Sequence, residues 1–374
     1  MTNSNLFDQK HLYFNDSLIN IIFFGPGYGE SILLYLPGLG WGIIDSCSVK
    51  IKKEKINPAL EYLKSQKVKN LAFLILTHPH LDHYKGLEDI LYYFMGAIDR
   101  ICYYSGAGLE EYARYLIRKK IINEPGLLGL KNILDLFQKA KESGSNLMRL
   151  AERTQIIRKK HYGNHMIEMI SLSPSENSER EYCERLYNCI PIDKPASIKD
   201  LKKSDQNLIS SAIWCEIDDK RFVFGSDLEN HSSRHSGWNG VLNNKDVPNL
   251  SALFVKIPHH GSPNAYNDNI WRVFSKDQKP LSVVTPYSKT TALRPDPNTI
   301  KNISKFSKDI YVTSRITFEK PQKIYKELDS TFVHGIESWK YIKLPNQLGF
   351  IKTTIQTNPD PDIEIFVKKP AYKY

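Results

Sequence analysis

Residues 71–86 read LAFLILTHPHLDHYKG, and this stretch decides the fold. It opens with six apolar residues, Leu71 to Leu76, an uninterrupted run typical of a strand covered on both faces, although so short a run also suits a buried helix. A dense group of possible metal ligands follows, in the pattern H-x-H-x-D-H. Imidazole and carboxylate groups bind zinc, manganese and iron, so the pattern predicts a metal site where a strand ends. The four ligands are His78, His80, Asp82 and His83.

The spacing of these ligands suggests two metal ions rather than one. His78 and His80 alternate to the same side of an extended segment. Asp82 and His83 lie in the turn that follows, where they can face a second ion.

The H-x-H-x-D-H pattern resembles the signature of the metallo-β-lactamase superfamily, and a second segment adds to the likeness. Leu253 to Ser262 read LFVKIPHHGS, another apolar strand that ends in histidines. Its K-x-P-H-H-G-S pattern is similar to a motif of the hydrolase domain of the competence protein ComEC and its free-standing relatives. The likeness extends from about Ile19 to Ser314. It implies an α/β protein with an αββα sandwich, in which two mixed β-sheets pack face to face with helices outside.

The resemblance also implies a ligand set. Asp227, directly after Phe-Gly-Ser, matches an aspartate that bridges the two ions, and His260 is assigned to the second ion. His259 then faces the substrate as a proton donor or phosphate contact, although the reverse assignment of the two histidines stays open. One ion would be held by His78, His80, Asp227 and an unidentified ligand or water, and the other by Asp82, His83, His260 and Asp227. Zn²⁺ is the expected metal, with Mn²⁺ and Fe²⁺ as alternatives.

Further residues take roles from the same resemblance. Asp45 stands where an aspartate supports the metal-binding loop from behind, although it also suits an ordinary strand end. Glu30 stands in an early glycine-rich turn where Asp is usual, and a hairpin is the preferred interpretation of that turn. The strand ending near Ser173 lacks the histidine that usually completes the first ion's ligands, and His161 and His165 are not assigned in its place. The expected catalytic residues are Asp82 and His259, and the expected substrate contacts are Asn207, Ser210, Ser262 and Arg294.

The chain of 374 residues is expected to form one domain over residues 1–374. A helical insertion is predicted over about residues 108–161, including the segment NLMRLAERTQIIRKK. The polar stretch from Glu176 to Ser204 has no clear period and predicts a mobile loop. Residues 316–374 form a strand-rich C-terminal extension, either a closing part of a sheet or a small appendage.

Composition limits the class of protein. Hydrophobic residues make up 41% and charged residues 25% of the chain, no apolar stretch is long enough to span a membrane, and the polar N-terminus lacks a signal-peptide pattern. Five scattered cysteines without a C-x-x-C pair indicate free thiols in a reducing cytoplasm. A formal net charge of +10 favours anionic partners such as nucleic acid or nucleotides.

These observations predict a metal-dependent hydrolase with a dinuclear centre. Two ions that share a water lower its pKa and present hydroxide to a scissile ester, so no side-chain nucleophile is needed. The expected activity is that of a phosphodiesterase or nuclease on DNA, RNA or a nucleotide. The alternatives are a thioester, lactone or β-lactam hydrolase on the same metals, and a degenerate member that only binds nucleic acid.

Overall fold

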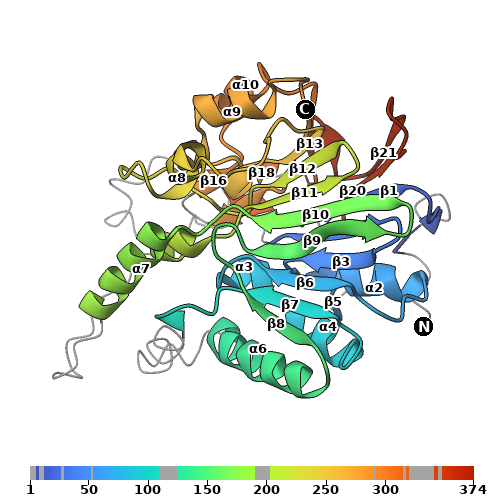
Figure 1. Ribbon diagram of the computed structural model, residues 1–374, viewed down its shortest axis with the longest axis horizontal. Coiled ribbons are helices and arrows are strands. Elements are labelled where there is room, and N and C mark those ends of the chain that lie inside the picture. The colour runs from blue at the N-terminus through green and yellow to red at the C-terminus, as the bar shows by residue number, and fades with distance from the viewer. Residues whose placement is uncertain are drawn as a thin grey trace, which may run out of the picture.

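The structure consists of two eight-stranded mixed sheets that pack face to face, with helices on the outer surface of each. The computed structural model describes residues 6–7, 12–26, 29–51, 54–109, 125–189, 203–289, 292–314, 317–319, 341–343 and 348–374. In Figure 1 helices α2, α4 and α6 lie below the sheets and α8, α9 and α10 lie above them. The four layers are therefore helices, sheet, sheet, helices.

The first sheet has the strand order β21-β20-β1-β2-β3-β6-β7-β8. Its strands are β1 (Ile19–Phe24), β2 (Ser31–Leu36), β3 (Gly40–Ile44), β6 (Phe73–Leu76), β7 (Arg100–Tyr103), β8 (Asn146–Arg149), β20 (Phe350–Ile355) and β21 (Ile363–Lys368). The helices described against its outer surface are α2 (Pro58–Ser65), α3 (Leu81–Tyr84), α4 (Leu87–Tyr93) and α6 (Pro125–Glu142).

The second sheet has the order β22-β17-β14-β13-β12-β11-β10-β9. Its strands are β9 (Gln155–Tyr162), β10 (His165–Ser171), β11 (Ile213–Ile217), β12 (Lys220–Phe224), β13 (Phe254–Lys256), β14 (Leu281–Val284), β17 (Asp309–Val312) and β22 (Tyr372–Lys373). The helices with this half of the chain are α7 (Glu176–Cys189), α8 (Gly237–Asn243), α9 (Asp268–Phe274) and α10 (Pro297–Ile303). It also contains the 3₁₀ helices η2 (Lys203–Ile209), η3 (Pro258–Gly261) and η4 (Pro263–Ala265). Three small hairpins complete the described elements: β4 (Val49–Ile51) with β5 (Glu54–Ile56), β15 (Tyr287–Lys289) with β16 (Ala292–Arg294), and β18 (Thr317–Glu319) with β19 (Tyr341–Lys343).

The apolar run Leu71 to Leu76 is a strand covered on both faces, as its composition predicts. All four residues of β6 are buried, because the strand lies inside the sheet between β3 and β7 and is parallel to both. Phe73 and Ile75 face the core between the sheets, whereas Leu74 and Leu76 face the outer helices. A run without polar residues is what such a position requires.

The core between the sheets is apolar and includes aromatic contacts from one sheet to the other. Phe23 of β1 stacks on Phe254 of β13 with ring centroids 5.3 Å apart. This contact ties the first strand of the chain to the strand that leads into the second histidine motif.

The parallel strands determine where the functional residues meet. β3 and β6 are parallel in one sheet, and β12, β13 and β14 are parallel in the other. Their carboxyl ends are followed by Asp45, His78, Asp227, His260 and Thr285, respectively. In open α/β sheets the carboxyl ends of parallel strands are the usual place for a site.

Two predictions of local structure are wrong. The helix predicted through residues 146–160 is a pair of strands, β8 and β9, since β8 pairs with β7 and β9 with β10. Pairing to neighbouring strands thus overrides a helix-like spacing of leucines. The loop predicted from Glu176 contains helix α7, which buries only the stripe Ser178, Tyr182 and Leu186 and is otherwise polar. The remainder of the predicted loop, residues 190–202, and the predicted helix over residues 110–124 lie outside the described residues.

The C-terminal strands are part of both sheets. β20 pairs with β1 along six residues, β21 pairs with β20, and β22 pairs with β17 in the second sheet. Residues 350–373 therefore help to close the sandwich and are not an appendage.

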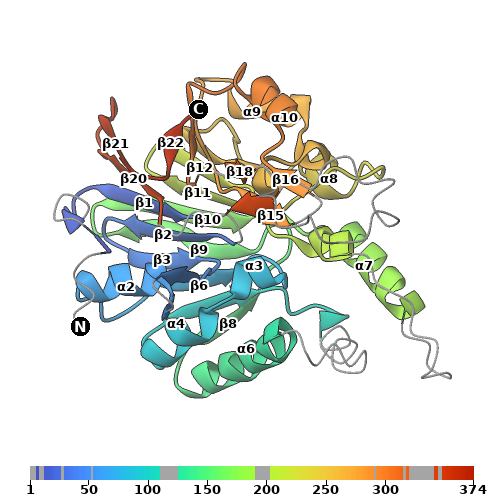
Figure 2. The same cartoon turned by 180° about the vertical axis from the view of Figure 1, so that it is seen from behind.

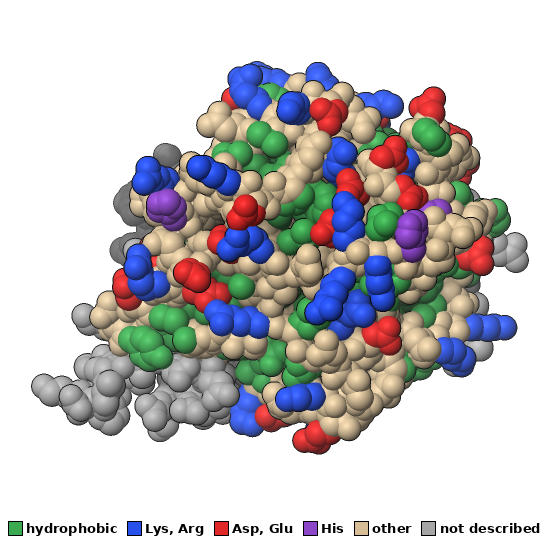
Figure 3. Space-filling view, viewed as in Figure 1, with side chains coloured by type: hydrophobic (Ala, Val, Ile, Leu, Met, Phe, Trp, Pro, Cys, Tyr) green, Lys and Arg blue, Asp and Glu red, His purple; other side chains and the backbone are tan. Residues whose placement is uncertain are grey.

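The basic run on the edge strand β9 lies in a surface of mixed charge. Arg158, Lys159 and Lys160 are exposed, but Lys159 lies 3.6 Å from Glu168 and 3.9 Å from Glu216. Figure 3 shows blue and red side chains interspersed over this face. Charged side chains on an edge strand protect it from pairing with another chain. No helix among the described residues is both long and apolar enough to cross a bilayer.

Candidate metal centre

The turn after β6 presents the histidines of the first motif to one point. The Nε2 atom of His78 lies 3.0 Å from Nδ1 of His80, and helix α3 begins directly afterwards and carries Asp82 and His83. The imidazoles of His78 and His83 are only 4.1 Å apart between ring centroids. The extended segment and the helical turn together therefore aim four side chains at a single region.

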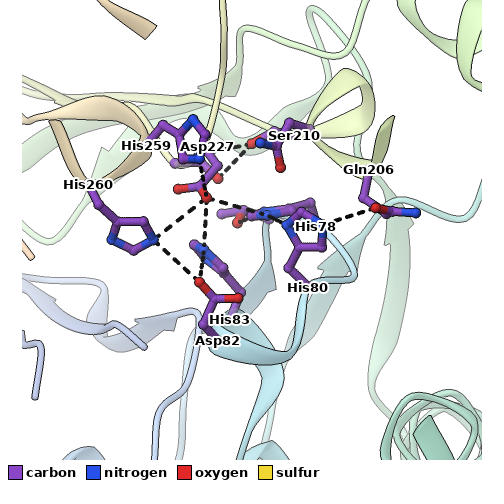
Figure 4. Close-up of polar contacts among 12 residues, drawn as sticks. His78, His80, Asp82, His83, Gln206, Ser210, Asp227, His259 and His260 are labelled. Carbon is purple, nitrogen blue, oxygen red and sulfur yellow. Dashed lines mark hydrogen bonds and ion pairs between the residues drawn. The ribbon is translucent and has the colours of Figure 1, made fainter. Parts of the chain in front are cut away.

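Asp227, which follows β12 of the other sheet, lies at the centre of this region (Figure 4). Its Oδ2 atom is 3.5 Å from His83 Nε2, 3.6 Å from His260 Nε2 and 3.9 Å from His78 Nε2. His260 Nε2 is in turn 3.4 Å from Asp82 Oδ2. All six residues predicted as metal ligands thus lie around one carboxylate.

The ligand atoms form two overlapping groups with Asp227 in common. We call His78, His80 and Asp227 the first half-site. We call Asp82, His83, Asp227 and His260 the second half-site.

The donor atoms fit a divalent cation. Among the described residues, His83 Nε2, His260 Nε2 and Asp227 Oδ1 are buried and have no hydrogen-bond partner. Buried polar atoms normally have partners, so these three ligand atoms of the second half-site suit a bound cation. Imidazole and carboxylate together suit Zn²⁺, Mn²⁺ or Fe²⁺.

Asp45 holds the histidine-rich turn from behind. Its carboxylate accepts hydrogen bonds from the Thr77 amide at 2.8 Å, the Thr77 hydroxyl at 2.7 Å and His83 Nδ1 at 2.8 Å. Its backbone is in the left-handed region, with φ 57°. An aspartate tolerates that conformation better than most residues, and here it directs Nε2 of His83 towards Asp227. These contacts support the role predicted for Asp45.

The H-H-G segment is a strained turn. His259 and His260 have φ values of 42° and 52°, and Gly261 has φ 76°. A Cβ atom on Gly261 would stand 2.7 Å from Cβ of Pro295, so glycine is required both for the backbone and for the close approach. Strained backbone of this kind is typical of functional sites. Here it points the two imidazoles in different directions.

The two histidines of this turn have different surroundings. His260 donates from Nδ1 to the Thr285 carbonyl at 2.8 Å, which leaves Nε2 facing Asp82 and Asp227. His259 has Nδ1 3.1 Å from Glu229 Oε1 and 3.1 Å from Asn264 Oδ1. The geometry therefore favours His260 as the ligand and leaves His259 beside the site, as in the preferred assignment.

Asp82 and His259 are the more open members of the cluster. Their side chains are 15% and 18% exposed, whereas those of His83, Asp227 and His260 are exposed by 3% or less. The two residues predicted to be catalytic therefore lie where a substrate can approach.

A buried ion pair behind the second half-site joins two segments far apart in the sequence. Lys256 Nζ lies 2.8 Å from Glu30 Oε1, and both side chains are fully enclosed. The other Glu30 oxygen accepts from the Thr285 hydroxyl, and the Glu30 amide donates to the Asp82 carbonyl at 3.1 Å. Glu30 thus contacts both ligand-bearing loops, a role that the hairpin interpretation of its turn did not include.

The charges of the cluster are mutually dependent. Burial by itself lowers the pKa of His83, but Asp227 and Asp45 outweigh it and hold that pKa well above its usual value. Burial raises the pKa of Asp227, yet His260 and His83 more than compensate and keep it well below the usual range. The pKa of Asp82 is likewise lowered, because its bond to His260 and the nearby imidazoles exceed the effect of burial. Both carboxylates are therefore ionised, as metal ligands must be.

Three of the predicted substrate contacts lie too deep for that role. Asn207, Ser210 and Ser262 are exposed by 2%, 0% and 1%. Ser210 Oγ accepts from the Asp227 amide at 3.0 Å and bonds Ser226 Oγ at 2.8 Å, so it supports the turn that carries Asp227. Asn207 donates to Glu229 at 2.5 Å and so lies behind His259. Asn207 and Ser210 therefore support neighbouring residues of the site, contrary to the role predicted for them, while the Ser262 hydroxyl is buried and has no hydrogen-bond partner among the described residues.

Arg294 is placed at the rim of the site. It ends β16 opposite Tyr287, whose ring stacks on His260 with centroids 5.1 Å apart. The Asp296 amide donates to the Gly261 carbonyl at 3.0 Å, which fixes this hairpin against the H-H-G turn. Arg294 is half-buried. Burial and the charge of Arg294 act to lower the pKa of His259, but Asp227 and Glu229 outweigh them and raise it above its usual value.

The first half-site lacks a histidine at the position near Ser173, as the sequence indicates. Ser173 Oγ donates to the Ser210 carbonyl at 2.7 Å and accepts from the Ala212 amide at 2.9 Å, so it is occupied in holding the backbone. His165 pairs with Asp218 at 2.9 Å, and His161 is exposed on β9. A residue missed from the sequence is Gln206, whose Oε1 lies 3.0 Å from His80 Nε2.

The missed residues had weak signals in the sequence. Lys256 belongs to the quoted K-x-P-H-H-G-S motif, and Glu30 replaces the usual Asp of an early turn, so both were visible as pattern positions without a role. Glu229 and Gln206 lie two and one residues from assigned positions, Asp227 and Asn207. Only their contacts distinguish them from ordinary polar residues.

The chain matches no known protein-family model, and no curated protein is similar to it in sequence. Among solved structures, it is similar to the metallo-β-lactamase fold protein YhfI from Bacillus subtilis at 12% identity, over 79% of this chain and 95% of that one, with a TM-score of 0.38. A diphosphatase of the PhnP family shares 11% identity over 71% of this chain and 86% of its own, with a TM-score of 0.34. Zn²⁺-bound PqqB from Methylobacterium extorquens shares 10% over 63% and 71%, with a TM-score of 0.30. Likenesses this remote carry no argument, and the two packed sheets with outer helices are themselves what confirms the predicted αββα sandwich.

Proposed function

We propose that the protein is a hydrolase that uses two divalent metal ions, and that its substrate is a phosphodiester in DNA, RNA or a nucleotide. The observation that carries this proposal is the gathering of five further ligand side chains, from segments of both sheets, around the Asp227 carboxylate. Zn²⁺ is the proposed metal, with Mn²⁺ and Fe²⁺ as alternatives.

Divalent ions held by these residues supply Lewis acidity and the ability to ionise water near neutral pH. The chain contributes ionised carboxylates at Asp82 and Asp227 and imidazoles whose ligand nitrogens are aimed by partners behind them. His259, held by Glu229 and Asn264, faces the open side, where it can donate a proton to a departing oxygen or bind an anionic one. A buried nucleophile is not required for this chemistry.

Arg294 favours an anionic substrate over a neutral one. It lies at the rim, on the hairpin that packs against the H-H-G turn, and a guanidinium there suits a phosphate oxygen pair. The net charge of +10 acts in the same direction. A neutral lactone gains nothing from this arginine, and a degenerate binding protein has no need of a complete ligand set.

A direct test compares two chromogenic substrates after the metal has been removed and restored. We expect hydrolysis of bis-p-nitrophenyl phosphate with Zn²⁺ or Mn²⁺, and none of a cephalosporin. We expect Asp82→Ala to abolish the reaction and Arg294→Ala to raise KM with little change in kcat, because Arg294 binds but does not react. Hydrolysis of the cephalosporin alone would replace the proposal with its alternative, and salt-dependent DNA binding without cleavage would support a degenerate binding protein.

Three finer predictions belong to this proposal. The likeness to ComEC-type hydrolases rests on the K-x-P-H-H-G-S segment. Cytoplasmic location rests on the scattered cysteines, and the single-domain organisation on the length of the resemblance. Cleavage of single-stranded oligonucleotides in preference to cyclic nucleotides would favour the nuclease form of the proposal.

A further inference from the structure

We infer that the two half-sites bind metal with unequal affinity, and that the second half-site, formed by Asp82, His83, Asp227 and His260, fills before the first. This inference rests on the proposed metal-dependent function. It concerns the order in which ions bind and makes no assumption about the substrate.

The number and charge of the donors differ between the half-sites. The second half-site collects two carboxylates and two imidazoles, whereas the first has two imidazoles and only the shared carboxylate of Asp227. Asp82, whose Oδ2 lies 3.4 Å from His260 Nε2 and 3.8 Å from His83 Nε2, serves the second half-site alone. A second negative charge in an enclosed place attracts a divalent cation strongly, because the effective dielectric there is low.

The residues that stand behind the ligand histidines also favour metal binding at the second half-site. In the second half-site His83 donates from Nδ1 to the Asp45 carboxylate at 2.8 Å, and the Glu30 carboxylate stands 3.8 Å from His83 Nδ1 and 3.7 Å from His260 Nδ1. In the first half-site the partners are neutral: the Thr77 hydroxyl lies 3.2 Å from His78 Nδ1, and the Gln206 amide oxygen 3.0 Å from His80 Nε2. An imidazole backed by a carboxylate is a better ligand than one backed by a neutral group.

Lys256 keeps Glu30 in place without cancelling this difference. Its ammonium group lies 2.8 Å from Glu30 Oε1, donates to the Ser226 carbonyl at 2.9 Å and stands 4.0 Å from Oδ1 of Asp227, the carboxylate that both half-sites share. The ion pair therefore offsets part of the charge of Glu30, while the Asp45 carboxylate, which accepts from two Thr77 groups and His83, keeps its charge next to the half-site. Asp45, Glu30 and His83 also lie close enough to suggest a third metal group, but their facing atoms are already engaged in these bonds.

No further histidine, cysteine or carboxylate joins the first half-site among the described residues. The usual position near the end of β10 holds Ser173, whose hydroxyl is committed to two backbone bonds. A cation there would depend on water or substrate for its remaining positions. The first half-site is therefore expected to be the weaker and the more exchangeable of the two.

The test is a metal titration of two matched variants, each of which damages one half-site. His80→Ala removes a ligand only from the first half-site, and Asp82→Asn removes a charge only from the second. Metal-free full-length protein is titrated with Zn²⁺ by calorimetry in the presence of a competing chelator, and native mass spectrometry counts the ions at each step. For the wild type we expect two steps separated by roughly tenfold or more, in line with the loss that weakened ligand shells produce.

Each of the two matched variants should change a different one of the two binding steps. We expect His80→Ala to keep the tight step and lose the weak one, and Asp82→Asn to weaken the tight step by roughly tenfold or more. Glu30→Gln/Lys256→Met, which removes the pair without leaving a lone buried charge, should weaken the tight step and spare the weak one. Circular dichroism and thermal melting of the metal-free proteins check that each variant is folded.

Two results overturn the inference: equal affinities for both ions, or loss of the tight step in His80→Ala with its retention in Asp82→Asn. The outcome is independent of the proposed substrate. A titration as expected, with no hydrolysis of bis-p-nitrophenyl phosphate by the fully loaded protein, would refute the phosphodiesterase proposal and leave the order of binding intact.

Discussion

Replacing Asp45 with asparagine tests how this chain controls a ligand from behind. The Asp45 carboxylate accepts from the Thr77 amide through Oδ1 and from His83 Nδ1 through Oδ2, each at 2.8 Å. An asparagine of the same shape keeps an acceptor for Thr77 but turns an N–H₂ group towards His83. Since two donors cannot face each other, His83 would take the other tautomer and place its proton on Nε2, the atom that faces Asp227.

The expected magnitudes follow from these contacts. Loss of a carboxylate partner behind a ligand histidine costs about 10–100-fold in metal affinity, which is about 1.4–2.7 kcal/mol. The free energy of unfolding should fall by no more than about 3 kcal/mol, the cost of one poorly satisfied buried group. It should not fall further, because burial already raises the pKa of Asp45 and so disfavours its charged form.

The assay is competition with a chromophoric chelator for Zn²⁺, in the His80→Ala background so that only the second half-site keeps its full ligand set. Asp218→Asn is a matched control: Asp218 also has a left-handed φ, 56° against 57°, and also accepts from a histidine, His165 Nδ1, at 2.9 Å. We expect Asp45→Asn to weaken Zn²⁺ binding and Asp218→Asn to leave it unchanged. Unchanged affinity in Asp45→Asn, or an equal loss in Asp218→Asn, would refute the reasoning.

Three further predictions concern stability. Gly42→Ala places a Cβ 2.1 Å from the Phe73 ring, so we expect denaturant unfolding to show a loss of about 1–3 kcal/mol, and an unchanged midpoint would contradict the packing described here. Burial lowers the pKa of Lys352 to about 8, so the folded protein releases this proton before the unfolded chain does; wild-type stability should therefore rise from about pH 8 to about pH 10, by up to about 3 kcal/mol, and Lys352→Met should remove that rise. The same pH dependence in both proteins would assign the rise to other groups. Removal of metal with a chelator should lower Tm, because it leaves the buried ligand atoms of the second half-site without partners, and a Tm independent of Zn²⁺ would argue against a site that binds it.

Sequence patterning was reliable where a signal is local and unreliable where it depends on neighbours. Strand β6 lies where the uninterrupted apolar run before His78 predicts a strand covered on both faces. Strands β8 and β9 were taken for helix, since their leucines and isoleucines suit either spacing until a neighbouring strand selects one. Helix α7 was taken for a loop because its buried stripe is only one residue wide per turn.

The candidate ligands could be identified from the sequence alone. His78, His80, Asp82 and His83 lie close together in one short segment, and each of the other two ligand segments follows an apolar strand. A short stretch of chain therefore fixes both the residue types and their spacing. The tertiary structure alone decided what stands behind them. Glu30 meets Lys256, and Asp45 meets His83, only because strands far apart in the sequence end at the same edge of the sandwich. A buried charge needs a partner, and the fold can supply that partner from any part of the chain. Such a partner is not recognisable in the sequence by periodicity or by a local pattern.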